Sequence, residues 1–137
     1  MAEALVLDSE AVNALARSQR GVLEDRARAI LSLARDRRAL VRVPAPVLGE
    51  VCRGPRFDAA INHLLNDSGI LVLDLTRPIA QRAGLLLAEA RMSSTNAVDA
   101  FVVASALEFD SALIATGDPA DMRRLAARHR SLGVFSI

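Results

Sequence analysis

The chain has no lysine, no tryptophan and no tyrosine, and it has a single cysteine. Without Trp or Tyr, and with only four Phe, we expect no aromatic platform for stacking single-stranded nucleic-acid bases. The lone Cys52 cannot form an internal disulfide and fits a reducing compartment. No apolar run approaches the roughly 20 residues of a membrane span, and no signal peptide is recognisable. These absences predict a soluble cytoplasmic protein.

The composition predicts one domain over residues 1–137 with a sizeable hydrophobic core. Hydrophobic residues make up 52% of the chain and aromatic residues 3%, so the core must consist of Leu, Val, Ile and Ala. The net charge is +1, and all 17 basic residues are Arg. Nucleic-acid binding would therefore depend on local clusters of arginine and not on a basic surface overall.

Short apolar segments alternate with amphipathic ones along the chain. The segments expected as strands are residues 5–7, 40–43, 70–75, 112–116 and 134–137. The helical patterns between them cover residues 22–38, 56–66, 78–92, 97–109 and 119–128, with shorter stretches after Ser9 and near Pro46. This alternation predicts a three-layer α/β/α sandwich around a mainly parallel sheet of about five short strands. The helix at 97–109 is apolar on nearly every face and should be buried centrally.

Five acidic residues lie where strands end or helices begin, namely Asp8, Glu50, Asp99, Asp118 and Asp121. Ligands of open parallel sheets bind beyond the carboxyl ends of the strands. If the first strand and the 112–116 strand are neighbours, Asp8 and Asp118 lie at one edge of the sheet. Like charges that converge there need a cation or a proton, and oxygen ligands select Mg²⁺ or Mn²⁺ over zinc.

Each of these acids also has an ordinary explanation. Asp8 can turn the chain into a helix for which Ser9 is a plausible N-cap, and Glu50 can be an exposed helix residue. Asn96 with Asp99, and Asp118 with Asp121, resemble acidic capping boxes, an explanation that fits Asp121 best. Taken singly, each acid favours the ordinary explanation. Five acids assigned to one edge of one sheet favour a functional site.

With these residues placed, the chain resembles the PIN-domain ribonucleases, especially the VapC toxins of bacterial toxin–antitoxin pairs. The segments that carry the resemblance are Leu5-Val6-Leu7-Asp8-Ser9, Val47-Leu48-Gly49-Glu50-Val51, Asn96-Ala97-Val98-Asp99-Ala100 and Thr116-Gly117-Asp118-Pro119-Ala120-Asp121. Each motif alone is weak, but their order, spacing and strand–helix context extend over nearly the whole chain.

The resemblance implies a Mg²⁺- or Mn²⁺-dependent endoribonuclease with a PIN-like fold. Asp8 and Asp99 would be the main metal ligands, directly or through water, and Asp118 would complete the acidic site. Glu50 would bind metal or would orient and deprotonate the attacking water. Ser9 and Thr116 would hold these groups by hydrogen bonds. The metal would lower the pKa of its bound water and neutralise charge on the scissile phosphate.

The resemblance also implies partners and accessory residues. Asp121 would be an accessory acid. The family commonly forms homodimers and is inhibited by a cognate VapB-like antitoxin, whose C-terminal segment lies over the early helices and the acidic site. The helix at 22–38 and the one after Ser9 would be its docking surface. For most of the apolar stripe of residues 22–38, packing on the chain's own sheet is the better explanation.

Three arginines are candidates for contacts to RNA phosphates. Arg123 and Arg124 follow the last acidic motif, and Arg53 lies close to Glu50. They could bind phosphate groups beside the metal. Arg123 and Arg124 also suit the last turns of a helix, where cations are favoured. Both explanations stay open at this point.

Two other classes of protein compete with the nuclease. A phosphotransfer or phosphatase-like domain would use Asp8 as its nucleophile, but such enzymes normally need a Lys, and the chain has none. A haloacid-dehalogenase-like enzyme would also need Asp where Glu10 stands. The second alternative is a non-catalytic α/β protein-binding module whose acids are helix caps. A converged metal site should raise the pKa of at least one acid, whereas scattered caps should not.

Overall fold

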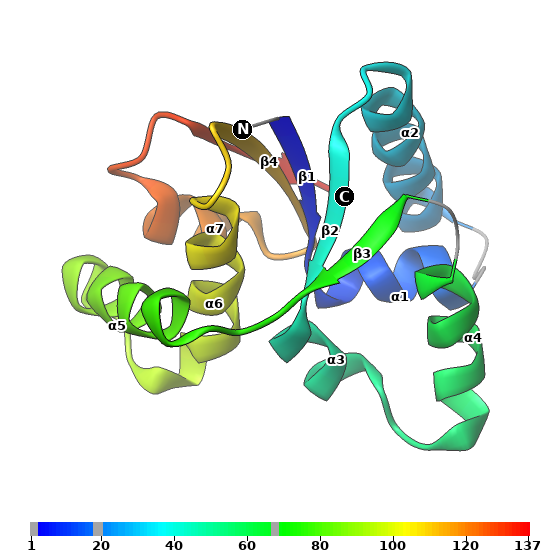
Figure 1. Ribbon diagram of the computed structural model, residues 1–137, viewed down its shortest axis with the longest axis horizontal. Helices are drawn as coiled ribbons and strands as arrows, with labels where there is room; N and C mark the ends of the chain where they lie inside the picture. Colours follow the sequence, from blue (N-terminus) through cyan, green and yellow to red (C-terminus); the bar gives the residue numbers. More distant parts are fainter. Residues whose placement is uncertain (1–2, 18–20, 67–68) are drawn as a thin grey trace.

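The computed structural model describes residues 3–17, 21–66 and 69–137 of the chain (Figure 1). In this part of the chain five strands form one sheet, in which all neighbouring strands are parallel. In chain order the strands are β1 (Glu3–Leu7), β2 (Leu40–Pro44), β3 (Ile70–Leu73), β4 (Ser111–Thr116) and β5 (Leu132–Ser136). Their spatial order is β3-β2-β1-β4-β5. The predicted parallel sheet is confirmed.

Helices cover both faces of this sheet, as predicted (Figure 1). The described helices are α1 (Ser9–Arg17), α2 (Val22–Asp36), α3 (Ala45–Val51), α4 (Pro55–Leu65), α5 (Arg77–Ala90), the 3-10 turn η1 (Ser94–Asn96), α6 (Ala97–Ala106) and α7 (Pro119–Ala126). Helices α1, α2 and α4 form one layer, and α5, α6 and α7 form the other. None of the helices in the described ranges has the length and apolarity of a membrane span.

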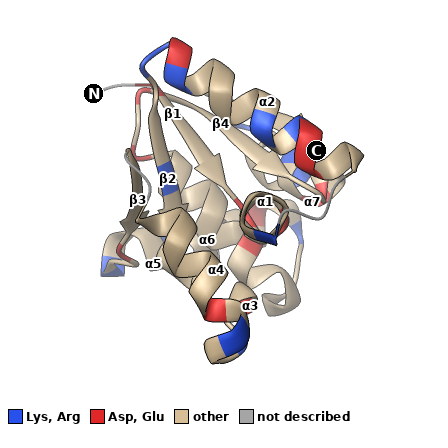
Figure 2. Ribbon diagram, turned by 90° about the vertical axis from the view of Figure 1, so that its right-hand side faces the viewer, with Lys and Arg blue, Asp and Glu red and all other residues tan. Residues whose placement is uncertain are grey.

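The core lies around the central strand β1 and the helix α6. From Ala4 to Leu7 every residue of β1 is buried, because both faces of this strand are covered. In α6, Ala100 and the run from Val102 to Ala106 are buried against β1, β2 and β4, so the prediction of a central helix is confirmed. Charged residues gather on the helices and loops, while the ribbon of the sheet is mostly free of them (Figure 2).

Several elements end earlier than the sequence pattern predicts. Strand β3 ends at Leu73 and not at residue 75, because its partner β2 ends at Pro44, which pairs with Leu73. Helix α5 ends at Ala90 because Arg91 adopts the left-handed conformation with φ 55°. These ends are fixed by a neighbouring strand or by one backbone angle, which hydrophobic periodicity does not report.

The edge strand β3 leaves apolar side chains exposed. It pairs with β2 alone in the described sheet. Leu71 is 57% exposed, and Val72 and the following Leu75 are exposed as well. An apolar edge strand of this kind is a template for pairing or packing with another chain.

The carboxyl ends of the parallel strands lie at one edge of the sheet, where the sequence predicts the acidic site. Leu7, the last residue of β1, pairs with Ala115 in the neighbouring β4. The residues that follow β1 and β4 therefore leave the sheet side by side. This is the arrangement that the sequence argument requires for Asp8 and Asp118.

Candidate metal centre at the carboxyl edge of the sheet

Asp8 turns the chain from β1 into α1. Its backbone N–H donates to the Ala115 carbonyl at 3.1 Å and extends the β1–β4 pairing. Its Oδ1 accepts the backbone N–H of Ala11 at 3.0 Å, so Asp8 caps α1 and the predicted cap at Ser9 is wrong. Asp8 is only 6% exposed. Burial raises its pKa from 3.8 to about 6, although hydrogen bonds from Thr116 and Ala11 lower it.

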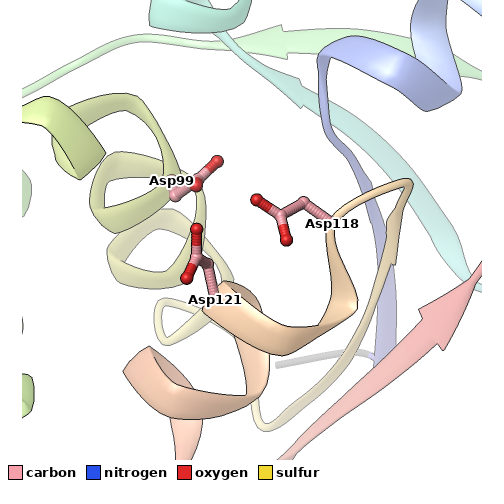
Figure 3. Close-up of side chains that lie close together, drawn as sticks. All are labelled: Asp99, Asp118 and Asp121. Atoms are coloured by element: carbon pink, nitrogen blue, oxygen red, sulfur yellow. The ribbon is translucent and has the colours of Figure 1, made fainter.

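The carboxylates of Asp99, Asp118 and Asp121 converge (Figure 3). One carboxylate oxygen of each lies within 4.8 Å of the other two. Asp99 comes from the first turn of α6, and the other two come from the start of α7. Neither helix has a side-chain cap hydrogen bond at its N-cap residue, Asn96 or Asp118. The carboxylates face one another, while the Asn96 side chain and the backbone N–H of Asp121 lower the pKa of Asp99 and Asp118, respectively.

Negative charge is crowded at this place. Burial comes first among the causes that raise the pKa of Asp99 from 3.8 to about 6, followed by the charges of Asp118 and Asp8. The charge of Glu50 adds to this shift. The pKa of Asp118 is also raised, first by desolvation and then by a hydrogen bond with Asp121 and its charge. Asp8 and Glu50 lie outside the three-acid group defined by the 4.8 Å distances and are linked to it through their charges on Asp99.

Thr116, the last residue of β4, connects two of these acids. It is fully buried, and its Oγ1 accepts the backbone N–H of Asp118 at 2.9 Å. The hydrogen bond between its side chain and Asp8 lowers the pKa of that carboxyl group. One hydroxyl can serve both neighbours because it donates its proton and accepts with a lone pair. The side chain thus fixes the two strand ends relative to each other.

Glu50 lies on α3, across the edge of the sheet from α1. The Oγ of Ser9 donates a hydrogen bond to Glu50 Oε1. Glu50 is exposed, yet its charge acts on Asp99. Its carboxylate therefore lies at the outer rim of the acidic cluster and is held there by the first residue of α1.

The three arginines predicted to contact phosphate have different surroundings. Arg53 Nη1 donates to the carbonyls of Gly49 at 2.8 Å and Cys52 at 2.9 Å, groups that the end of α3 leaves without helical partners. Arg123 and Arg124 are exposed on α7, the helix that carries Asp121. Among the described residues neither of these two forms an ion pair. Arg53 is thus engaged by α3, and Arg124 Nη2 donates to the Arg91 carbonyl at 3.4 Å, a longer contact than those of Arg53.

Two residues of the site were not identified from the sequence. The sequence predicts a cap at Asn96, whereas its Nδ2 donates to Asp121 Oδ2 at 3.1 Å. Glu10 lies against Gly117, where an added Cβ would overlap the Glu10 carboxylate. No local signal could find either contact, since both join segments more than 20 residues apart.

The residues present fit a divalent cation. Within the described ranges, none of the five acids lies within the 4.0 Å ion-pair distance of an arginine. The group therefore has crowded carboxylates and no protein cation to neutralise them. Its donors are oxygen atoms alone, which suit Mg²⁺ or Mn²⁺ and not zinc.

Comparison with known proteins agrees with the fold. A model of the PIN domain family matches residues 5–128. Among solved structures, the chain is similar to a chain in the crystal structure of VapBC2 from Rickettsia felis bound to a DNA fragment from their promoter. The match has a TM-score of 0.64 and 12% sequence identity, and it covers 96% of this chain and 97% of that chain. At this identity the likeness concerns the fold. No curated protein matches the sequence.

Proposed function

The chain belongs to the PIN domain family, whose members are generally nucleases, and on this premise we propose that it is a Mg²⁺- or Mn²⁺-dependent endoribonuclease. The proposal extends to its biological setting: the protein would be the VapC-type toxin of a toxin–antitoxin pair and would act in the cytoplasm. The observation that carries the enzymatic part is the convergence of Asp99, Asp118 and Asp121, with Asp8 and Glu50 in the same electrostatic cluster.

Asp8, Asp99 and Asp118 would hold the metal, with Asp121 as an accessory acid. Asp8 can take part although it caps α1, because a carboxylate offers about four lone-pair sites and the hydrogen bonds from Thr116 and from the backbone of Ala11 and Glu10 do not fill all of them. When bound, Mg²⁺ or Mn²⁺ supplies positive charge beside the scissile phosphate and lowers the pKa of a water molecule. The buried Thr116 would keep Asp8 and Asp118 in place.

Glu50 would orient the attacking water and accept its proton. Two observations support this role: the residue is exposed at the rim, and its Oε1 accepts a hydrogen bond from Ser9. A proton acceptor must be within reach of the substrate while remaining fixed in orientation. Ser9 meets the second requirement because it is the first residue of α1, directly after the buried Asp8.

The arginines of α7 would contact the phosphate groups of the RNA. Arg123 and Arg124 are two and three residues beyond Asp121 on the same helix, and both are exposed. A strand bound at the acidic site would thus meet guanidinium groups within one helical turn. Arg53 would have to release two backbone carbonyls before it could bind phosphate and Arg124 only one, at 3.4 Å, so we assign Arg53 the smaller contribution to phosphate binding. Without Trp or Tyr, recognition would rest on the RNA backbone and its shape.

A VapB-like antitoxin would bind over α1, α2 and α4. Between these helices lies a cavity of about 480 Å³, lined by Leu15, Ala16, Arg28, Ala60, His63, Leu64 and Asn66. Apolar side chains are exposed at the start of α2, where Val22 and Leu23 lie, and at the start of α4, where the Arg17 guanidinium lies 4.9 Å from the centre of the Phe57 ring. An apolar partner segment would cover these groups. The solved structure with the same fold is itself a VapBC2 assembly.

The same fold would form a homodimer through the apolar edge strand β3. Leu71, Val72 and Leu75 are exposed there. Strand β3 is at the opposite edge of the sheet from β5. Pairing through this strand would leave the helical surface of α1 and α2 free for the antitoxin. The dimer and the inhibited complex could therefore exist together.

The decisive experiment is cleavage of total cellular RNA by the purified protein with Mg²⁺ or Mn²⁺, and with EDTA. We expect defined cuts that disappear with EDTA and in Asp99→Asn, and that persist in Asp36→Asn, a matched change at the far end of α2. Mapping the cut ends would identify the RNA target. If the folded protein neither cleaves RNA nor gains stability from either metal, the proposal is wrong and a protein-binding module takes its place.

A further inference from the structure

The Glu10 side chain occupies the space where a side chain of residue 117 would begin, and residue 117 is a glycine. It is the second residue of α1, and Gly117 connects β4 with α7. A Cβ added at Gly117 would overlap the carboxylate of Glu10 and would lie 3.0 Å from its Cβ. Among the 20 amino acids, only glycine at 117 leaves this space to the Glu10 side chain. The absence of a side chain between Thr116 and Asp118 thus allows the Glu10 carboxylate to lie there.

The position of Glu10 is not explained by its own helix. An acid in the first turn is favoured by the helix dipole, but the dipole does not require contact with a distant loop. In the described part of the chain, no arginine forms an ion pair with Glu10. Its carboxylate lies against Gly117, the residue that precedes Asp118, and its backbone is two residues beyond Asp8. Glu10 therefore places a further negative charge beside acids that form no ion pair with an arginine in the described ranges.

We propose that Glu10 is a further positioning acid of the metal centre, held over Gly117, whose carboxylate strengthens the binding of the divalent cation from outside the Asp99–Asp118–Asp121 group. This inference rests on the proposed function. Mg²⁺ keeps several of its water molecules in protein sites, and an outer carboxylate can accept hydrogen bonds from them. A negative charge close to the site also attracts the cation directly. The repulsion that Glu10 causes in the metal-free protein then becomes attraction.

The glycine makes this proposal testable from two independent positions. Glu10→Gln keeps the shape of the side chain and removes its charge. Gly117→Ala keeps the charge and displaces the carboxylate, because the new methyl group occupies its space. Residues around a metal site typically change metal affinity 10- to 100-fold when mutated. We therefore expect each change to weaken Mn²⁺ binding by roughly 10-fold.

The measurement is titration of the metal-free protein with Mn²⁺ by calorimetry, together with the rise in Tm that Mn²⁺ causes. Wild type is compared with Glu10→Gln, Gly117→Ala, Glu10→Ala and the double variant Glu10→Ala/Gly117→Ala. Glu89→Gln on α5 serves as a matched control for the loss of one exposed negative charge. In the Glu10→Ala background the methyl group has no carboxylate to displace and meets only the Cβ of residue 10 at 3.0 Å, so we expect Gly117→Ala to cause a much smaller loss there than in wild type.

The outcomes separate this inference from the proposed function. If wild type neither binds Mn²⁺ nor is stabilised by it, the metal centre itself is wrong. If wild type binds Mn²⁺ and Glu10→Gln binds it equally well, only the role of Glu10 is wrong. Should Gly117→Ala weaken binding as much in the Glu10→Ala background as in wild type, the glycine acts without Glu10 and the displacement argument fails. Circular dichroism of each variant identifies any that are unfolded.

Discussion

At the scale of single residues, Asp8 combines two roles that oppose each other in the metal-free protein. Its carboxylate caps α1 by accepting the Ala11 N–H, and this contact keeps it buried beside other acids. Burial raises its pKa from 3.8 to about 6. The folded protein therefore holds a proton on Asp8 more tightly than the unfolded chain does. The ionised carboxylate thus stabilises the start of α1 as its cap, whereas the burial of its charge destabilises the folded state.

This opposition predicts how Asp8→Asn changes stability with pH when metal is absent. As pH rises from about 4 to above 6, wild type should lose stability, because the folded state must give up a proton that it binds tightly. The amide keeps an acceptor for Ala11 and carries no charge. We expect Asp8→Asn to be more stable than wild type at pH 7 by up to about 3 kcal/mol, at 1.36 kcal/mol per pKa unit. Below about pH 4 this difference should vanish.

Urea unfolding in EDTA across pH 4–8 checks this expectation. Asp36→Asn, at an exposed position on α2, is the control and should follow wild type at every pH. A constant loss of stability in Asp8→Asn at all pH values would contradict the argument, since it would mean that the residue acts as a cap alone. Addition of Mn²⁺ should stabilise wild type more than the variant.

Residue positions were predictable from the sequence where a residue directly follows a strand. Asp8 and Asp118 could be assigned to one edge because the carboxyl ends of parallel strands meet there. The contact between Asn96 and Asp121 could not be predicted, since it depends on how α6 and α7 pack. An acid in the first turn of a helix is common, so nothing local pointed to the contact of Glu10 with Gly117. The roles assigned to these residues in metal binding remain predictions.

At the scale of secondary-structure elements, α6 is the support of the site. Asp99 stands in its first turn, and the residues after it are buried against three strands. A helix that is packed on all sides can move little, because protein interiors are close-packed. The position of the Asp99 carboxylate is therefore set by the packing of the α6 side chains.

This arrangement predicts a large difference between two Val→Ala changes in helices. Val102 in α6 is fully buried, whereas Val22 in α2 is 67% exposed. Val102→Ala removes about two buried methyl groups and leaves a cavity, so we expect a loss of about 2 kcal/mol. Val22→Ala should change the free energy of unfolding by less than about 0.5 kcal/mol.

The midpoint of urea unfolding gives the change in the free energy of unfolding for each variant, provided that the dependence of this free energy on urea concentration is unchanged. Equal effects of the two substitutions would mean that α6 is not the packed centre of the molecule.

The existence and type of the elements followed from hydrophobic periodicity, whereas their ends did not. The apolar run at residues 70–75 continues past Leu73, but β2 offers no further partner there. The helical pattern at residues 22–38 includes Arg38, whose φ of 57° is incompatible with a continuing helix. Hydrophobic periodicity indicates which face of an element is buried. Where the element ends depends on backbone dihedral angles and on the length of the neighbouring strand.

At the scale of the whole molecule, the sheet has one edge that is suited to association. Leu71 on β3 is 57% exposed, next to Val72 and near Leu75. If the homodimer forms through this edge, a charge there should disrupt it. We expect Leu71→Arg to convert the dimer to a monomer in sedimentation experiments at micromolar concentration, because an arginine would be buried without a partner.

Leu85→Arg on α5 is the matched control, since Leu85 is 59% exposed and lies outside β3. It should leave the dimer intact. A wild-type protein that sediments as a monomer would reject the dimer, and a dimer that survives Leu71→Arg would reject this edge as its interface.

The order of the strands has a consequence for the synthesis of the protein. Strand β1 lies between β2 and β4 in the sheet. Asp8, which follows β1, can therefore meet the other acids only after β4 has been synthesised. Asp99, Asp118 and Asp121 are all in the last third of the chain. At roughly 5–20 residues per second, a ribosome needs on the order of 6–24 s to reach residue 121. A nascent chain that has not reached residue 121 thus carries no complete acidic cluster, so the proposed nuclease activity would not reach the translating ribosome before that residue is made.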